Sequence, residues 1–121
     1  MIESALAMLV FAVLIAGILE VSFATFVCNS VAFAAQRAAR FAAARGSTSG
    51  HPATAAEVQA TARAYAGPLS AGALDVAVTW TPDNSPGSTV LVKVSCRMQP
   101  MLPLSATGLT LQGMARQPIA Q

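Results

Sequence analysis

The N-terminal third of the chain is a long apolar segment without a helix breaker. From Ser4 to Leu19 no residue is charged, and the first proline is Pro52. Ala, Leu and Met favour the helical conformation, and Gly46, with the polar residues that follow it, is a suitable end. The pattern predicts a single helix over 2–45, which at 1.5 Å per residue is about 65 Å long.

Such a helix is about twice as long as the ~30 Å hydrocarbon layer of a bilayer is thick. Its second half is amphipathic, because apolar residues such as Val27, Val31 and Ala38 recur at helical spacing while arginines lie on another side. We therefore predict two regions. Residues 1–27 form the half that spans a membrane or lies in the core of a filament, and residues 28–121 form an outer domain that includes the amphipathic half.

Two acids in the first half, Glu3 and Glu20, need explanation, because a charge within hydrocarbon costs at least ~2.5 kcal/mol. Two interpretations are open. In the first, Glu3 lies among the headgroups and Glu20 marks the outer edge of a short span over Ser4–Leu19. In the second, both acids act in assembly: Glu3 neutralises the N-terminal amine of a neighbouring copy, and Glu20 binds an arginine or a polar group.

Small residues recur four positions apart along the same segment. Such rows allow helix backbones to approach closely, although alanine is abundant throughout this part of the chain. We interpret them as candidate helix-packing positions. The residues concerned are Ala12, Ala16, Ala34, Ala38 and Ala42.

The charges around the apolar run bear on its orientation. No Lys or Arg precedes the run, while Arg37, Arg40 and Arg45 follow it, which favours an outside N-terminus. That orientation conflicts with a domain that lies outside the cell. A basic leader would remove the conflict, because it would set the orientation before it is cleaved. The competing interpretation is a secretory signal peptide cut after Ala34, but the apolar run is too long for a typical signal sequence and lacks a basic start.

A second helix is predicted after the polar loop that begins at Gly46. Thr54 and Glu57 have the spacing of a capping box at the start of a helix over 55–66. One face of this helix is apolar and is expected to pack against the rest of the domain. That face carries Val58, Ala62, Tyr65 and Ala66.

The remainder of the chain has the alternation of a small sheet. Apolar residues recur at every second position over 74–81 and again over 90–98, and the turn-rich segment 82–87 separates the two runs. A weaker third strand is predicted over 107–116. The expected fold class is α+β: a long hydrophobic N-terminal helix that continues into a small domain with a second helix and a roughly three-stranded antiparallel sheet.

The chain has two cysteines and few large aromatic residues. Cys28 lies where the long helix leaves the membrane, and Cys96 points to the predicted buried face. Two alternatives are open: a disulfide that closes a large loop, worth roughly 4 kcal/mol on the chain-entropy account, or two inert buried thiols. Tyr65 and Trp80 are expected to be core or interface aromatics.

Composition bears on the function classes. Seven Lys and Arg against five acids give a net charge of +2 without a basic run, so we expect no nucleic-acid partner. The single histidine, His51, lies in a polar loop, and the sequence has neither metal-ligand spacing nor a glycine-rich phosphate loop. We therefore expect no catalytic residues, no metal and no cofactor.

Five segments follow one another in a recognisable order along the chain. Met1–Leu6 carries an acid and begins an aliphatic run, Gly17–Glu20 is a Gly-x-x-Glu-like step, Asn29–Val31 comes next, Ala34–Ala42 is an Ala-rich stretch with arginines, and Leu109–Arg116 is the closing strand. Together these segments resemble TadE-like pilus proteins. Gln36 stands where the family usually has an arginine, and Arg37 follows it.

The resemblance implies a pilin-like structural subunit of the tight-adherence branch of type IV pilus systems. Such proteins are matured by a prepilin peptidase, held in the inner membrane by the N-terminal helix, and assembled by pilus machinery into an extracellular filament with copies of themselves or other pilins. Glu3 and Glu20 would correspond to the family's two acids. The alternative is a single-span accessory or assembly protein of a pilus or secretion system that does not polymerise.

Overall fold

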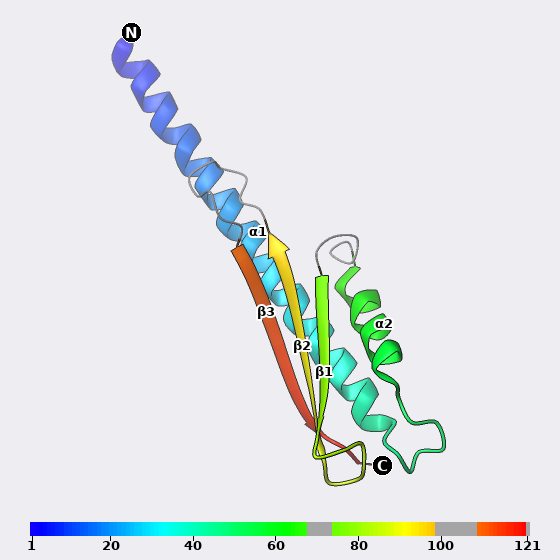
Figure 1. Cartoon of the computed structure of the whole chain (residues 1–121). Helices are drawn as coiled ribbons and strands as arrows, with labels where there is room; N and C mark the ends of the chain where they lie inside the picture. The colour runs from blue at the N-terminus through cyan, green and yellow to red at the C-terminus, as the bar shows by residue number, and fades with distance from the viewer. Residues whose placement is uncertain (68–73, 99–108, 121) are drawn as a thin grey trace.

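The computed structural model describes residues 1–67, 74–98 and 109–120. A long helix projects from a small domain, in which the sheet and a second helix pack against its C-terminal half (Figure 1). In chain order the elements are α1 (Ile2–Ala44), α2 (Ala55–Ala66), β1 (Leu74–Thr81), β2 (Thr89–Met98) and β3 (Leu109–Pro118). The predicted α+β fold, with two helices and a three-stranded antiparallel sheet, is confirmed.

α1 is one uninterrupted helix of 43 residues, as the apolar segment without proline predicts. It ends one residue before the predicted boundary. The backbone N–H of Arg45 donates to the carbonyl of Ala42 at 3.2 Å, which tightens the last turn. The carbonyl of Arg45 then accepts from the backbone N–H of Ala53 at 2.9 Å, so the connecting loop returns to the end of the helix.

Only the second half of α1 contributes to the core. Its first buried residue is Val27, and Ala24 packs against the core from one turn earlier. The buried face is made almost entirely of alanine, so the sheet and α2 can approach the helix backbone closely. Its members are Val27, Val31, Ala34, Ala35, Ala38, Ala39, Ala42 and Ala43.

α2 begins at the predicted capping box. The backbone N–H of Glu57 donates to Thr54 Oγ1 at 3.3 Å, and the backbone N–H of Thr54 donates to Glu57 Oε2 at 3.1 Å. Val58, Ala62 and Ala66 are buried, as their spacing predicts. Tyr65, expected on the same face, packs its ring edge to face against Phe33 of α1, while its side chain stays 47% exposed at the edge of the buried face.

The sheet has the order β1-β2-β3, with both pairs antiparallel. Val78 of β1 pairs with Val92 of β2, which pairs with Ala115 of β3. Val90, Val92 and Val94 of the central strand are fully buried, so the inner face of the sheet packs on the helices. Gln59 Nε2 of α2 donates to the carbonyl of Val76 at 3.3 Å, which ties α2 to β1.

β3 approaches α1 most closely at Gly113. A Cβ placed there would lie 2.7 Å from the backbone nitrogen of Ala32 and 2.8 Å from its Cα, distances that real Cβ atoms essentially never show. Gly113 is buried, and the backbone of β3 therefore rests directly on the backbone of α1. Glycine is required at this position for steric reasons.

The third strand ends two residues later than predicted. Its described part runs over Leu109–Pro118, the prediction was 107–116, and residues 107 and 108 lie outside the described residues. Pro118 pairs with Thr89, the first residue of β2. A proline without an N–H is tolerated at the end of an edge strand, which is why the strand extends past the predicted boundary. β2 likewise begins one residue earlier than predicted.

A hydrogen-bonded turn closes the end of the domain farthest from the N-terminus. Asp83 Oδ1 accepts from the backbone N–H of Ser85 at 3.0 Å and from Ser88 Oγ at 2.9 Å, and it also contacts Ser85 Oγ. These bonds lower the pKa of Asp83, chiefly through the Ser85 hydroxyl. Ile119 exchanges backbone bonds with Gly87 and Ser88, which secures the C-terminal segment to the same turn.

Candidate functional site

The most unusual surface among the described residues is the projecting half of α1, which comprises residues 1–27. Single exposed apolar residues are normal, but a contiguous apolar surface marks a membrane or protein interface. Thirteen large apolar side chains before Ser22 are at least 43% exposed. They are Met1, Ile2, Leu6, Met8, Leu9, Val10, Phe11, Val13, Leu14, Ile15, Ile18, Leu19 and Val21.

The projecting half is compatible with a membrane anchor. α1 contains an 18-residue window with a mean hydropathy of 2.5, and none of that window is buried inside the chain. A span of about 20 apolar residues matches the hydrocarbon thickness of a bilayer. By length and composition, α1 is thus long and apolar enough to cross a membrane while its second half remains in the domain.

The two acids of α1 lie in different surroundings. Glu3 is exposed in the first turn, where a negative charge is favoured by the helix dipole. Glu20 is half-buried. It precedes Ala24, Val27 and Val31 at steps of four, three and four residues, so it lies on the side of the helix that faces the sheet. Glu20 therefore stands at the junction between the projecting half and the domain.

The predicted helix-packing residues divide into two groups. Ala34, Ala38 and Ala42 are fully buried, so within the folded chain their small side chains serve the contact of α1 with the sheet and α2. Ala12 is exposed and Ala16 is half-buried on the projecting half. Ala12 is therefore the member of the row that is most open to another helix.

The two thiols are free and lie in different environments. Cys28 is exposed on α1, whereas Cys96 is buried on the inner face of β2. Burial raises the pKa of the Cys96 thiol, because the thiolate is less well solvated there. The two cysteines are not joined by a disulfide in the structure. The alternative was two buried thiols, and only Cys96 is buried.

A further surface feature was not anticipated from the sequence. The rings of Phe33 on α1 and Tyr65 on α2 meet edge to face, with centroids 5.8 Å apart and an interplanar angle of 80°. The guanidinium carbon of Arg37 lies 5.1 Å from the Phe33 centroid and 5.6 Å from the Tyr65 centroid. We call these three residues the aromatic–arginine cluster. The four-residue step from Phe33 to Arg37 was the available signal, but the partner ring comes from another helix.

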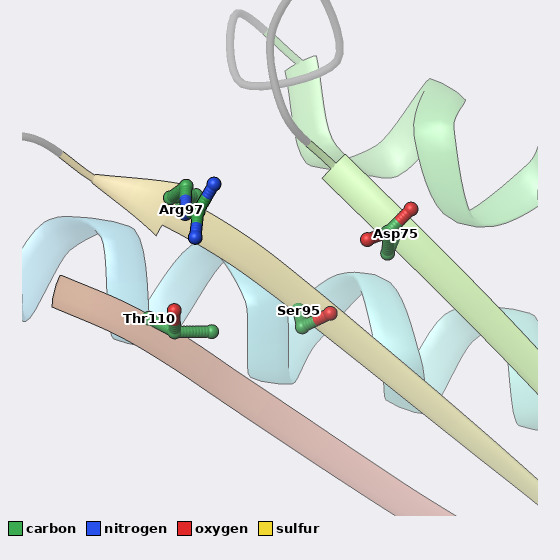
Figure 2. Close-up of a pocket in the computed structure, with 4 residues that line it drawn as sticks. All are labelled: Asp75, Ser95, Arg97 and Thr110. Carbon is green, nitrogen blue, oxygen red and sulfur yellow. The ribbon is translucent and has the colours of Figure 1, made fainter. Parts of the chain in front are cut away.

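The outer face of the sheet has a polar depression of about 310 Å³. Figure 2 shows the four described side chains that line it: Asp75 of β1, Ser95 and Arg97 of β2, and Thr110 of β3. A carboxylate, a guanidinium and two hydroxyls can hydrogen-bond to a polar molecule. These four residues include neither a histidine nor a thiol, so they do not form a nucleophile–histidine pair of the kind used in covalent catalysis.

Metal coordination has no support among residues 1–67, 74–98 and 109–120. Within these ranges no group of three or more His, Cys, Asp or Glu side chains is placed to hold a metal ion. His51 is exposed in the loop between α1 and α2. The features of this surface that stand out are thus the projecting apolar half, its two acids and the aromatic–arginine cluster.

No family model, curated protein or solved structure matches this chain.

Proposed function

We propose that this chain is a structural pilin-like subunit of a type IV pilus of the tight-adherence kind. Its N-terminal helix anchors it in the inner membrane before assembly and packs in the core of an extracellular filament afterwards. The small α+β domain faces outward. Its partners are copies of itself or other pilins, together with the pilus assembly machinery and a prepilin peptidase.

The observation that carries the proposal is the continuity of α1. One helix without a break is an exposed apolar rod in its first half and the spine of a packed domain in its second half. The connection between anchor and domain is therefore helical and not a flexible linker. A rigid connection of this kind suits a subunit whose domain must occupy a fixed position relative to the helices beneath it.

The exposed apolar side chains of the projecting half must be shielded from water. Burying one large aliphatic or aromatic side chain is worth about 1.5–3 kcal/mol, so the thirteen exposed ones represent on the order of 20 kcal/mol or more. A typical domain is stable by only about 5–15 kcal/mol. Water is thus a poor environment for this surface. Lipid covers it before assembly, and the same rod on neighbouring copies covers it in the filament.

The acids of α1 then have roles in assembly. Glu3 is exposed at the first turn of the helix, where it is available to neutralise the N-terminal amine of a neighbouring copy. Such a pair is worth most where water is excluded, because an unpaired charge in an apolar core is costly. In this scheme Glu3 selects the axial position at which an incoming subunit is accepted.

Purified surface filaments test the proposal. Mass spectrometry of filaments sheared from wild-type cells should detect peptides of this chain in stoichiometric or minor amounts. Glu3→Ala should reduce the amount of chain in the filaments while leaving its level in the membrane unchanged. Asp75→Ala, which removes an exposed acid of the outer domain, is the matched control and should have no effect.

Two results would contradict the proposal. If the chain fractionates wholly with membranes and is missing from filaments, it is the single-span accessory protein that does not polymerise. If filaments form normally from Glu3→Ala chains, the proposed pairing with the amine is wrong.

A further inference from the structure

We propose that the aromatic–arginine cluster is the surface on which the projecting half of α1 from a second copy docks. This inference rests on the proposed function and adds to it a defined contact on the outer domain. The contact is head to tail: residues 1–27 of one copy lie against Phe33, Arg37 and Tyr65 of another.

The cluster has the composition of an interface centre and is only partly covered. Phe33 is 44% exposed and Tyr65 is 47% exposed, so almost half of each side chain faces solvent. Arg37 is also exposed. Aromatic residues and arginine are enriched in the energetically dominant parts of protein interfaces. Because both helices contribute a ring, the rings are held in place before any partner arrives.

The face of α1 that carries the cluster is continuous with the projecting half. Phe26, Phe33, Arg37 and Arg40 follow one another at steps of seven, four and three residues, so they lie on one side of the helix. All four are exposed, and this side lies away from the buried face that contains Val31. The side is therefore apolar towards the N-terminus and cationic towards the C-terminus.

Charge identifies the occupant. Of the five acids in the chain, Glu3 and Glu20 lie within residues 1–27, which contain no Lys or Arg. All seven basic residues and the other three acids lie in residues 28–121, so the side-chain charges of the two regions sum to −2 and +4. A partner that suits this face must be apolar and acidic. The projecting half of a second copy has both properties.

The guanidinium of Arg37 can serve both contacts at once. Its guanidinium carbon lies over the two rings, at 5.1 and 5.6 Å from their centroids, and guanidinium N–H groups can also donate to a carboxylate. Aromatic contacts hold the arginine in one position, which lowers the entropy lost when a carboxylate binds. The apolar side chains beside that carboxylate would then cover the exposed parts of Phe33 and Tyr65.

The geometry of the contact produces an open assembly. The aromatic–arginine cluster and residues 1–27 lie at different heights along the same helix. Two parallel copies must therefore be shifted along their axes to bring the cluster of one against residues 1–27 of the other. Glu20 precedes Arg37 by 17 residues, about 26 Å along the helix, and Glu3 precedes it by 34 residues, about 51 Å. Each copy then retains a free surface at either end. Such heterologous contacts form rings or helical filaments, and parallel helices with an axial shift cannot close into a ring.

Photo-cross-linking tests the docking directly. A photoreactive phenylalanine analogue is placed at Tyr65 in the full chain, in cells that also make an isotopically labelled wild-type chain, and filaments are irradiated and digested. We expect cross-linked peptides that join position 65 to residues 1–27 of the other copy. The same analogue at Met114, an exposed position on the outer face of the sheet, should not join to this region.

Cross-links from position 65 that lead only to residues 28–121, to another protein or to lipid would overturn the docking. Substitution gives an independent readout. Arg37→Ala and Tyr65→Ala should each lower the yield of filaments at least tenfold, with thermal unfolding of the domain close to wild type. Arg116→Ala removes an exposed cation from β3 and should leave the yield unchanged.

The failure of this inference differs from the failure of the proposed function. Normal filament yields from Arg37→Ala and Tyr65→Ala chains, with this chain present in the filaments, would refute the docking surface and leave the pilin role intact. Wild-type filaments without this chain would refute the pilin role itself.

Discussion

Gly113→Ala tests how the sheet rests on the long helix. The added Cβ would lie 2.7–2.8 Å from the backbone of Val31 and Ala32 in α1. These are backbone atoms in the middle of a helix, so no side chain can rotate away to relieve the contact. β3 must move off α1 by several tenths of an ångström, which loosens the contacts around Ala115 and Leu111. Overpacking of this kind costs about 1–3 kcal/mol, and we expect the upper part of that range.

The effect can be measured by chemical unfolding of the full chain in detergent micelles. The fluorescence of Trp80, the single tryptophan, reports on the domain because its ring packs against the core. Gly113→Ala should lower the unfolding midpoint without changing the slope. Gly17→Ala is the matched control: apart from the backbone of its own helix, nothing lies within 4 Å of its Cβ position, so the domain transition should not move. An unchanged midpoint for Gly113→Ala would refute the close approach of β3 to α1.

Three further predictions concern the domain. Thr54→Ala removes one half of the capping box and should destabilise the domain by about 1 kcal/mol in thermal unfolding; an unchanged Tm would mean that the cap is dispensable. Asp83→Asn should lower stability near neutral pH, where the wild-type carboxylate accepts its bonds. Because the pKa of Asp83 is lowered in the folded state, the extra stability of the wild type over the variant should be lost as the pH falls through this folded-state pKa. Identical dependence of stability on pH for the two proteins would contradict this prediction. Val92→Ala should cost about 1–3 kcal/mol in urea unfolding, since the side chain is fully buried, and a smaller loss would show that the core collapses around it.

Local patterns were enough to predict most of the architecture. The absence of proline before Pro52 predicted one unbroken helix, and Gly46 with the polar residues after it predicted an end within one residue of the observed end. The Thr54–Glu57 spacing predicted the start of α2, and alternation predicted β1 and the pairing of β1 with β2. These signals succeed because each is a property of neighbouring residues: a cap, a period or a turn.

The features that sequence reasoning missed depend on contacts between distant elements. Tyr65 was expected to be a core or interface aromatic, but its contact with Phe33 and Arg37 of the other helix was not predicted. Gly113 carries no local sign that it meets Ala32, more than 80 residues earlier in the chain. The projecting half of α1 was predicted as an apolar segment. The aromatic–arginine cluster that continues one side of this half could not be predicted, because Tyr65 joins it only through the packing of α2.

The measurement that tests the account most directly is the intact mass of this chain in filaments sheared from the cell surface. The account predicts a species that still contains the whole apolar segment from Ser4 to Phe33 and that dissociates from the filament only in detergent. A native chain recovered as a water-soluble monomer that begins after Phe33 would contradict it.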